Sequence, residues 1–423
     1  MEIFFTKLKL IFADRNLSRR LLFLILILAL TRLGSAIPMP GIDRLQLARV
    51  FAGDQFLGFL DIFAGGGLSS LSIMMLGVGP FITASIIIQL LTLIFPAIKQ
   101  LYHEEGEAGR RKVAQYSRLL TIPLAVFQSV GLMVLLQSRG LVLSLTSFEK
   151  VTSIIVVVAG SILLMWLGEL ISEYGIGNGV SLIIFAGIVA QLPSLLSQLA
   201  VTFDVSQIPL YLAFVVIALV ALALVVFITE AERPIPITYA KRMRGMKMYG
   251  GMSTYLPIRV NNAGVMPIIF ALSILLFPQM VANFLTNSSI PILQVISTSL
   301  LSFMNQTWLY GSFYFLLVFV FTYFYSAVTF DPEAIATNLQ KNGAFIPGVR
   351  PGKSTAIYIS TILTRLTLVG ALFLGLIALL PIVLRALTDI SALAIGGTSL
   401  LIVVSVALDF VKQIEAQITM REY

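Results

Sequence analysis

Three ionisable residues lie within or beside long apolar stretches of this chain: Arg32, Glu169 and Asp409. Ionisable side chains inside a membrane usually mark an ion pathway or a proton relay. All three fall near the ends of their stretches, where a long side chain can reach headgroups or water. Because no carboxylate falls near the middle of a stretch, the sequence argues against an ion-coupled transporter.

Other residue types that support catalysis or metal binding are scarce. The chain has no cysteine and a single histidine, His103, which excludes thiolate metal sites and histidine clusters for haem or zinc. It contains no phosphate-binding G-x-x-x-x-G-K-[ST] motif and no dinucleotide-binding fingerprint. We therefore expect no enzyme activity, no metal ion and no cofactor.

The composition is that of a polytopic membrane protein. Of the 423 residues, 58% are hydrophobic and only 11% are charged, and the mean hydropathy is +0.97. A membrane-spanning helix needs roughly 17 to 25 mainly apolar residues. Ten runs fit this length: residues 21–37, 73–96, 116–137, 151–171, 179–199, 208–229, 263–284, 308–328, 366–384 and 394–411.

Lysine and arginine are concentrated on one side of these spans. Of the 28 basic residues, 22 fall in the N-terminal segment, in the loops after the second, sixth and eighth spans, and in the C-terminal segment, counting Arg118 at the edge of the third span with the loop before it. Basic residues favour the cytoplasmic side, so ten spans place both termini in the cytoplasm. We expect residues 1–20 to form an amphipathic segment at the cytoplasmic interface.

One apolar stretch, residues 54–96, is broken by glycine and proline. Gly65, Gly66 and Gly67 are consecutive, and Gly77, Gly79 and Pro80 follow. Glycine and proline cost about 1 and about 3 kcal/mol relative to alanine inside a helix. The pattern predicts a short half-helix over 56–70 and then a full span, an arrangement typical of elements that line a water-filled path.

A short internal repeat relates the second span to the seventh. Residues 77–87 read GVGPFITASII and residues 264–274 read GVMPIIFALSI, with six of eleven positions identical. The second span runs from the outside of the membrane to the cytoplasmic side, and the seventh span runs from the cytoplasmic side to the outside. The pair therefore fits an inverted repeat, with the functional path at the interface between the two halves.

Branched aliphatic residues follow these glycines at helical spacing. Val78, Ile82 and Ile86 share one face of a helix, as do Val180 and Ile184, and Ile269 follows Pro267. Most such stripes are ordinary packing or lipid-facing residues. A ring of them around a pore would instead form an apolar constriction that water and ions avoid. Isolated amides on the spans, Gln89, Gln128 and Asn261, are able to hydrogen-bond between helices.

Two long cytoplasmic loops, residues 230–262 and 329–365, carry ten of the 28 basic side chains. Tyrosine, proline and glycine accompany these charges. Such a surface is able to hold an acidic partner such as ribosomal RNA or a motor protein. The alternative is that the charges only set the topology.

Many motifs in one order resemble the SecY family, which forms the channel subunit of the Sec protein translocase. The resemblance covers nearly the whole chain and rests on IPMPGI, ITASIIIQLL, EGEAGRRKVAQYSR, GIGNGVSLIIFAGIVA, YAKRMRG, STYLPIRVNNAGVMPIIFA, FIPGVRPGK, TRLTLVGALF and GGTSLLIVV. The family implies an all-α membrane protein of ten transmembrane helices in two inverted five-helix halves, a clamshell with a re-entrant plug half-helix.

The resemblance also implies roles for individual residues. It assigns a hydrophobic pore ring to Val78, Ile82, Val180, Ile184, Ile269 and Ile402. It assigns the lining of a lateral gate to Thr83, Gln89, Gln128, Asn261, Ser273 and Phe277. It assigns the plug to Phe63, Gly65, Gly66, Gly67 and Leu68, and docking of a motor or ribosome to Lys241, Arg242, Arg244, Lys247 and Arg350.

The implied organisation has an N-terminal half over 21–200 with the plug at 56–70, and a C-terminal half over 201–412 with docking loops 230–262 and 329–365. A cytoplasmic tail follows at 413–423. The implied partners are small SecE-type and SecG-type membrane subunits, a SecA-type ATPase motor, the ribosome, signal peptides and preproteins, and membrane lipid. The implied location is a bacterial plasma membrane or a plastid thylakoid.

The implied activity is passive conduction of unfolded preproteins, with sideways release of apolar segments into lipid and energy supplied by the partner. The residues alone leave two alternatives open. One is a secondary transporter for a small solute, suggested by the broken span and the inverted repeat. The other is an insertase or scaffold without a pore.

Overall fold

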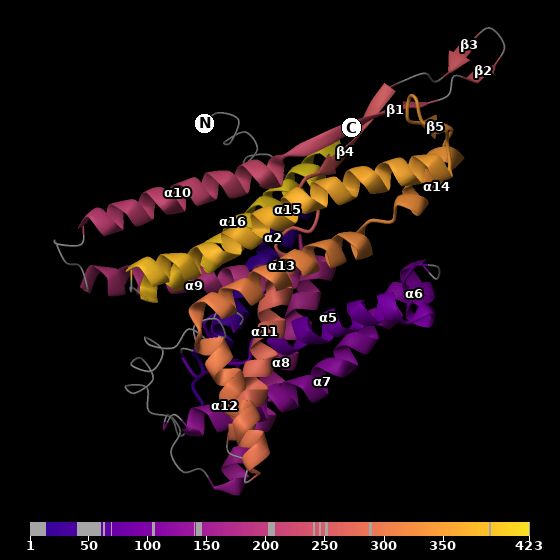
Figure 1. The fold of residues 1–423 in the computed structure, drawn as a ribbon. Coiled ribbons are helices and arrows are strands. Elements are labelled where there is room, and N and C mark those ends of the chain that lie inside the picture. The colour runs from indigo at the N-terminus through magenta and orange to yellow at the C-terminus, as the bar shows by residue number, and fades with distance from the viewer. Residues whose placement is uncertain are drawn as a thin grey trace. The chain divides into compact units, whose positions relative to one another are not determined.

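The computed structural model describes residues 14–39, 61, 64–68, 70–103, 106–138, 140, 146–201, 208–239, 242–244, 247–249, 253–286, 290–388 and 391–422 (Figure 1). The chain divides into two compact units. The first comprises residues 1–218, 272–311 and 380–423, and the second comprises residues 219–271 and 312–379.

The first unit is built from helices that pack side by side. Its members are α2 (Arg15–Ala36), α5 (Gly79–Ile94), α6 (Pro96–His103), α7 (Gly106–Ser138), α8 (Ser147–Tyr174), α9 (Gly179–Val201), α12 (Pro291–Asn305) and α16 (Ser391–Glu422). α5 and α6 pack on α7, α7 packs on α8, and α8 packs on α2 and α9. α16 covers α9.

Local sequence explains where several of these helices begin. The Asp14 carboxylate accepts a hydrogen bond from the Asn16 amide and caps α2. Thr146 and Glu149 form a reciprocal capping box at the start of α8. Pro80 stands in the first turn of α5, where its missing N–H costs nothing.

Four further helices run across the boundary between the units in sequence: α10 (Ile208–Glu230), α11 (Met266–Thr286), α13 (Thr307–Thr329) and α15 (Lys353–Thr388). Among the described residues, five helices are long and apolar enough to cross a membrane, and four shorter apolar helices accompany them. On α10, Leu212, Leu219 and Phe227 are more than 60% exposed. Such a surface is stable in lipid rather than in water, so this is an integral membrane protein.

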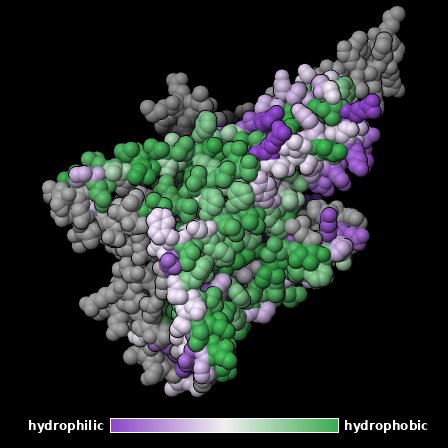
Figure 2. All heavy atoms as spheres, viewed as in Figure 1, coloured by the Kyte–Doolittle hydropathy of each residue, from purple (hydrophilic) through white to green (hydrophobic). Residues whose placement is uncertain are grey.

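The second unit contains a small sheet, so the expectation of an all-α fold is wrong in this respect. β1 (Glu232–Tyr239) pairs antiparallel with β4 (Ser253–Arg259) and with β5 (Ala344–Phe345). β2 (Arg242–Arg244) and β3 (Lys247–Tyr249) form a separate hairpin. Helix α14 (Pro332–Lys341) packs beside β5. Figure 2 shows apolar side chains over the helices and hydrophilic side chains gathered around this sheet.

Alternation of side chains explains the sheet. Ile235 and Ile237 of β1 are buried, while Pro234 and Pro236 are exposed. Ile235 joins a core with Ile258, Ile346 and Ile359. Proline normally argues against a strand interior, and Pro234 and Pro236 concealed this pattern in the sequence.

The structure also differs from the expected spans at the broken stretch. The second span was expected to start at residue 73, but α5 begins at Gly79 and residues 70–78 form turns. Within the expected half-helix at 56–70, the structure describes residues 61, 64–68 and 70. Residue 61 is helical, and residues 64–68 and 70 form turns. Helices α6, α12 and α14 were not expected from the sequence.

A close helix–backbone contact gives a test of this arrangement. A Cβ added at Gly160 of α8 would lie 2.2 Å from the carbonyl oxygen of Ile73, so Gly160→Ala must displace backbone. We expect a loss of about 1–3 kcal/mol in the free energy of unfolding, seen as a lower Tm in detergent. Gly79→Ala is the matched control, because its Cβ would meet only Gln128 at 3.9 Å. Equal Tm values for the two variants would contradict the packing.

Candidate functional site

Between α2 and α5, the described residues 61, 64–68 and 70–78 lie in the interior of the first unit. Leu68, Leu71 and Met75 of this segment are at most 2% exposed. They belong to one apolar core with Leu132 and Leu136 of α7. The same core includes Val157 of α8 and Met280 of α11. We call the described residues of this stretch, 61, 64–68 and 70–78, the inner segment.

Hydrogen bonds engage backbone groups of the inner segment, whose described residues from 64 onward are not helical. The Ser72 amide donates to the Gly67 carbonyl at 2.9 Å, and the Ile73 amide donates to the Ile37 carbonyl at 3.1 Å. The Ser161 hydroxyl of α8 donates to the Gly77 carbonyl at 2.9 Å. Non-helical backbone is tolerated at membrane depth only when protein groups or water supply such partners.

Arg32 of α2 reaches the inner segment instead of the membrane surface, which corrects the expectation for this residue. One terminal nitrogen of its guanidinium donates to the Gly65 carbonyl at 2.9 Å. The other donates to the Ala186 carbonyl of α9. A planar guanidinium can serve two acceptors at once, so Arg32 joins three parts of the chain.

Asp61 and Gln191 form a second link between the inner segment and α9. One oxygen of the buried Asp61 carboxylate accepts from the Leu68 amide at 3.0 Å. The other accepts from the Gln191 amide nitrogen at 2.8 Å. Asp61 also attracts the Arg32 guanidinium electrostatically. We call Arg32, Asp61 and Gln191, with the backbone carbonyls of Gly65 and Ala186, the polar clamp.

Glycine allows the inner segment and α9 to approach closely. A Cβ at Gly187 would lie 2.3 Å from the Gly65 Cα, closer than real Cβ atoms approach a neighbour. Gly65 and Gly66 adopt φ values of +62° and +83°, which other residue types rarely adopt. The positive φ values therefore explain why glycine occupies two positions of the three-glycine run, Gly65 and Gly66.

α7 and α11 meet along a seam beside the same core. The Phe127 and Phe277 rings lie 5.6 Å apart between centroids. One turn further along, a Cβ built on Gly131 would lie 4.0 Å from the Met280 Cβ. We call these four residues the α7–α11 seam.

Several gate candidates lie on the helices of this seam and on α5. Thr83 and Ser273 are buried, Gln89 and Gln128 are half-buried, and Phe277 is 42% exposed. In the part of the chain that the structure describes, Gln89 Oε1, Ser129 Oγ and Ser273 Oγ are buried without a hydrogen-bond partner. Asn261, in the second unit, donates to the Gly264 carbonyl at 3.4 Å.

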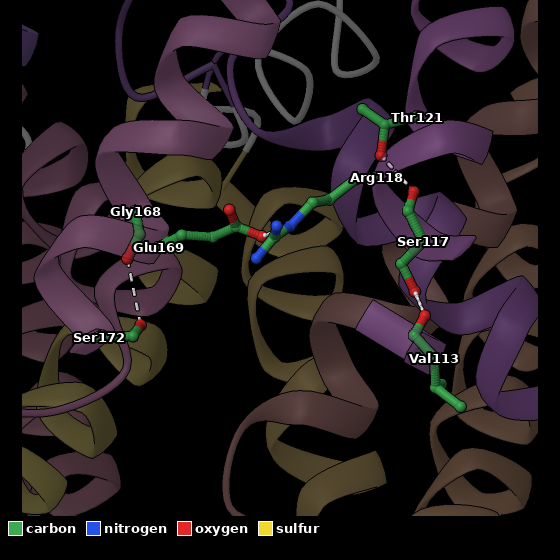
Figure 3. Close-up of polar contacts among 7 residues, drawn as sticks. All are labelled: Val113, Ser117, Arg118, Thr121, Gly168, Glu169 and Ser172. Atoms are coloured by element: carbon green, nitrogen blue, oxygen red, sulfur yellow. Dashed lines mark hydrogen bonds and ion pairs between the residues drawn. The ribbon is translucent and has the colours of Figure 1, made fainter. Parts of the chain in front are cut away.

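An ion pair ties α7 to α8 away from the apolar core. Arg118 Nε donates to Glu169 Oε1 at 2.6 Å, and both side chains are partly exposed (Figure 3). Next to Glu169, the Ser172 hydroxyl donates to the Gly168 carbonyl and accepts from the Gly179 amide. The Glu169 carboxylate is therefore paired with an arginine of α7.

The pore-ring candidates are almost all buried. Val78, Ile82, Ile184, Ile269 and Ile402 are at most 6% exposed, and Val180 is half-buried. Val78 and Ile82 stand one turn apart at the start of α5, where the Ile82 amide donates to the Val78 carbonyl. Ile269 belongs to the second unit and the other five to the first.

The docking candidates fall on the second unit. Arg242 and Arg244 belong to β2 and Lys247 to β3, whereas Lys241 lies outside the described residues. Arg350 is exposed in the turn after β5, and its carbonyl accepts from the Thr355 hydroxyl at 2.9 Å. Of the plug candidates, Phe63 also lies outside the described residues.

A family model named SecY matches residues 72–411. The chain belongs to the SecY family. It is 43% identical over 416 residues to the protein translocase subunit SecY of Synechococcus elongatus, covering 96% of this chain and 94% of that one. It is 45% identical over 426 residues to the same subunit of Halalkalibacterium halodurans, covering 98% and 97%. The resemblance inferred from the motifs is thereby confirmed.

Solved structures show the same fold. The protein matches a structure described as a protein conducting channel with a TM-score of 0.64 at 21% identity, covering 93% of this chain and 91% of that chain. It matches Sec61 in the canine ribosome-channel complex from the endoplasmic reticulum with a TM-score of 0.60 at 20% identity, over the same shares. A mostly helical SecY-like fold is therefore established.

Some residues of this SecY-family site were not identified from the sequence. Phe127, Gly131 and Met280 complete the α7–α11 seam, and their only sequence signal was the helical spacing of Phe127 with Gly131 and of Phe277 with Met280. No sequence signal indicated the contact between Asp61 and Gln191, because these two residues are 130 positions apart along the chain.

The seam can be tested by cross-linking, since the chain has no cysteine of its own. The 4.0 Å separation at Gly131 and Met280 lies within the usual Cβ–Cβ range for disulfides, about 3.5–4.5 Å. We expect Gly131→Cys with Met280→Cys to form an intramolecular disulfide under mild oxidation, detected by mass spectrometry. The control pair, Val126→Cys with Met280→Cys, places one thiol on an exposed face of α7. Equal oxidation of both pairs would argue against the seam.

Proposed function

We propose that this protein is the channel subunit through which unfolded preproteins cross a membrane, and from which apolar segments leave sideways into lipid. The observation that carries the proposal is the inner segment, a largely buried stretch that contacts α2, α7, α8 and α9 and whose described residues from 64 onward are not helical. Membership of the SecY family, over nearly the whole chain, supports the same function. The channel is passive, and a partner supplies the energy.

In this proposal, the part of the inner segment up to residue 70 belongs to the plug, and the pore ring forms the constriction. Gly65, Gly66, Gly67 and Leu68 belong to the plug, and the family motif extends it over 56–70. The ring consists of Val78, Ile82, Val180, Ile184, Ile269 and Ile402. Branched apolar side chains exclude water and ions from a narrow passage, yet they can separate around a wide flexible chain.

The α7–α11 seam acts as part of the lateral gate, together with Thr83, Gln89, Gln128, Asn261 and Ser273. Its aromatic and sulfur contacts are apolar, and the unpartnered oxygens on α5, α7 and α11 are available to new partners when the helices separate. Apolar segments would leave here because transfer into lipid is favourable by tenths of a kcal/mol per leucine or isoleucine. The two five-helix halves, 21–200 and 201–412, would move apart on opening.

The second unit presents the docking surface. Arg242, Arg244, Lys247 and Arg350, with Lys241, would hold acidic groups of a ribosome or of a SecA-type motor. Ribosome-bound channel complexes among the structures with this fold support a ribosomal partner. Small SecE-type and SecG-type subunits complete the assembly. Both termini and the 413–423 tail lie in the cytoplasm of a bacterial cell, or in the stroma if the membrane is a thylakoid.

The pore ring can be tested by ion conductance. A triple variant in which serine replaces Ile82, Ile184 and Ile269 should raise the resting conductance of planar bilayers about tenfold, because water and ions can enter a polar constriction. Ile155→Ser is the control, since this side chain is 61% exposed on α8. A triple variant that leaks no more than the control would refute the ring.

The gate can be tested with the disulfide across the seam. In proteoliposomes that hold the full chain, its small subunits and the motor, the oxidised Gly131→Cys/Met280→Cys channel should translocate at most about a tenth as much preprotein as the reduced one. Reductant should restore transport, and each single cysteine variant should ignore the oxidant. Normal transport through a fully cross-linked channel would exclude a gate at this seam. Ion-coupled uptake of a small solute would favour a transporter instead.

A further inference from the structure

We propose that Arg32 is a positioning residue that holds the plug closed by fastening it to α9. This inference rests on the proposed function of the inner segment as a plug. Arg32 itself contacts no pore-ring residue in the hydrogen bonds described for it. It acts through the backbone carbonyls of Gly65 and Ala186.

The first argument is the choice of acceptors. Gly65 lies in the plug and Ala186 lies in α9, 121 positions away along the chain. A guanidinium that donates to both carbonyls holds the two elements at a fixed spacing. Hydrogen bonds from a charged donor are stronger than neutral ones, and a buried charge that loses its partners is costly. The arginine therefore favours the closed position strongly.

The second argument is that the clamp has its own counter-charge. The buried Asp61 carboxylate attracts the half-buried Arg32 guanidinium electrostatically, and it also accepts hydrogen bonds from the Leu68 amide and from Gln191 of α9. The plug is thus linked to α9 twice, once through its backbone and once through its carboxylate. A Cβ at Gly66, between these two links, would lie 3.0 Å from Gln191 Nε2 and 3.6 Å from an Arg32 nitrogen.

The third argument is steric and independent of charge. The polar clamp needs the plug and α9 to be in backbone contact, and only glycine at 187 permits this, because a Cβ there would lie 2.3 Å from the Gly65 Cα. A methyl group at this position should push the plug away while all three polar side chains remain. Loss of the guanidinium and addition of the methyl group should therefore have the same effect on plug position.

The position of the plug can be measured by thiol labelling. Ser70 is half-buried, and its hydroxyl donates to the Ser35 carbonyl of α2 at 3.0 Å. We would place Ser70→Cys in the full-length chain, which has no other thiol, and follow its reaction with a membrane-impermeant maleimide in proteoliposomes. Resting ion conductance of the same samples gives the functional readout.

We expect Arg32→Ala to raise the labelling rate about tenfold and to raise the conductance with it. Arg32→Lys should give an intermediate rate, because an ammonium group keeps the charge but lacks the planar fork that reaches two carbonyls. Gly187→Ala should also raise the labelling rate. Combining it with Arg32→Ala should add little, because both substitutions release the same contact between the plug and α9. Arg20→Ala removes the same charge from an exposed site on α2 and should change nothing.

Labelling of folded Arg32→Ala at the wild-type rate would overturn the clamp. If Arg32→Ala does not fold, Arg32→Lys and Gly187→Ala decide, and wild-type rates in both would equally overturn it. Deletion of residues 61–70 separates this inference from the proposed function. Unchanged conductance after the deletion means that the segment is not a plug. A leaky deletion with an unaffected Arg32→Ala means that the plug exists but that Arg32 does not hold it.

Discussion

Buried backbone groups without water must find protein partners, and the inner segment depends on this constraint. A helix satisfies its own amides and carbonyls, whereas turns at membrane depth do not. The segment obtains partners from within itself, from the carbonyl of Ile37, from the hydroxyl of Ser161 and from the guanidinium of Arg32. These partners come from helices on different sides, so the break in the second apolar stretch is stable only where α2, α8 and α9 already stand together.

The same constraint explains the glycines on the surrounding helices. Gly160 of α8 and Gly187 of α9 each face backbone atoms of the inner segment at distances that leave no room for a Cβ. Gly179 similarly faces the Gly168 carbonyl where α8 turns into α9. Close approach allows hydrogen bonds between elements and excludes water, at the cost of weaker helix propensity. The glycines of α8 and α9 and those of the inner segment therefore serve one structural purpose.

Hydropathy and composition predict much of the architecture, because lipid imposes simple rules on length and charge. The predicted spans for α8, α10 and α13 end within a few residues of the helix ends, whereas α7 begins ten residues before its predicted span, and the broken stretch was located by its glycines and Pro80. Strand β1 was not predicted, because Pro234 and Pro236 mask its alternation. The seam contacts and the destination of Arg32 were not predictable either. They depend on which helices pack together, and a single sequence records only the neighbours along one helix.

Two kinds of interaction hold the inner segment, and they differ in how they respond to displacement. The apolar core around Leu68, Leu71 and Met75 weakens gradually, since dispersion contacts tolerate small shifts and side chains can repack. The polar clamp weakens abruptly, because a hydrogen bond is lost over a fraction of an ångström and leaves a buried charge unpaired. Once the segment moves far enough for water to reach Arg32 and Asp61, water replaces the lost partners. For the proposed movement of the plug, we therefore infer two distinct states rather than a continuum.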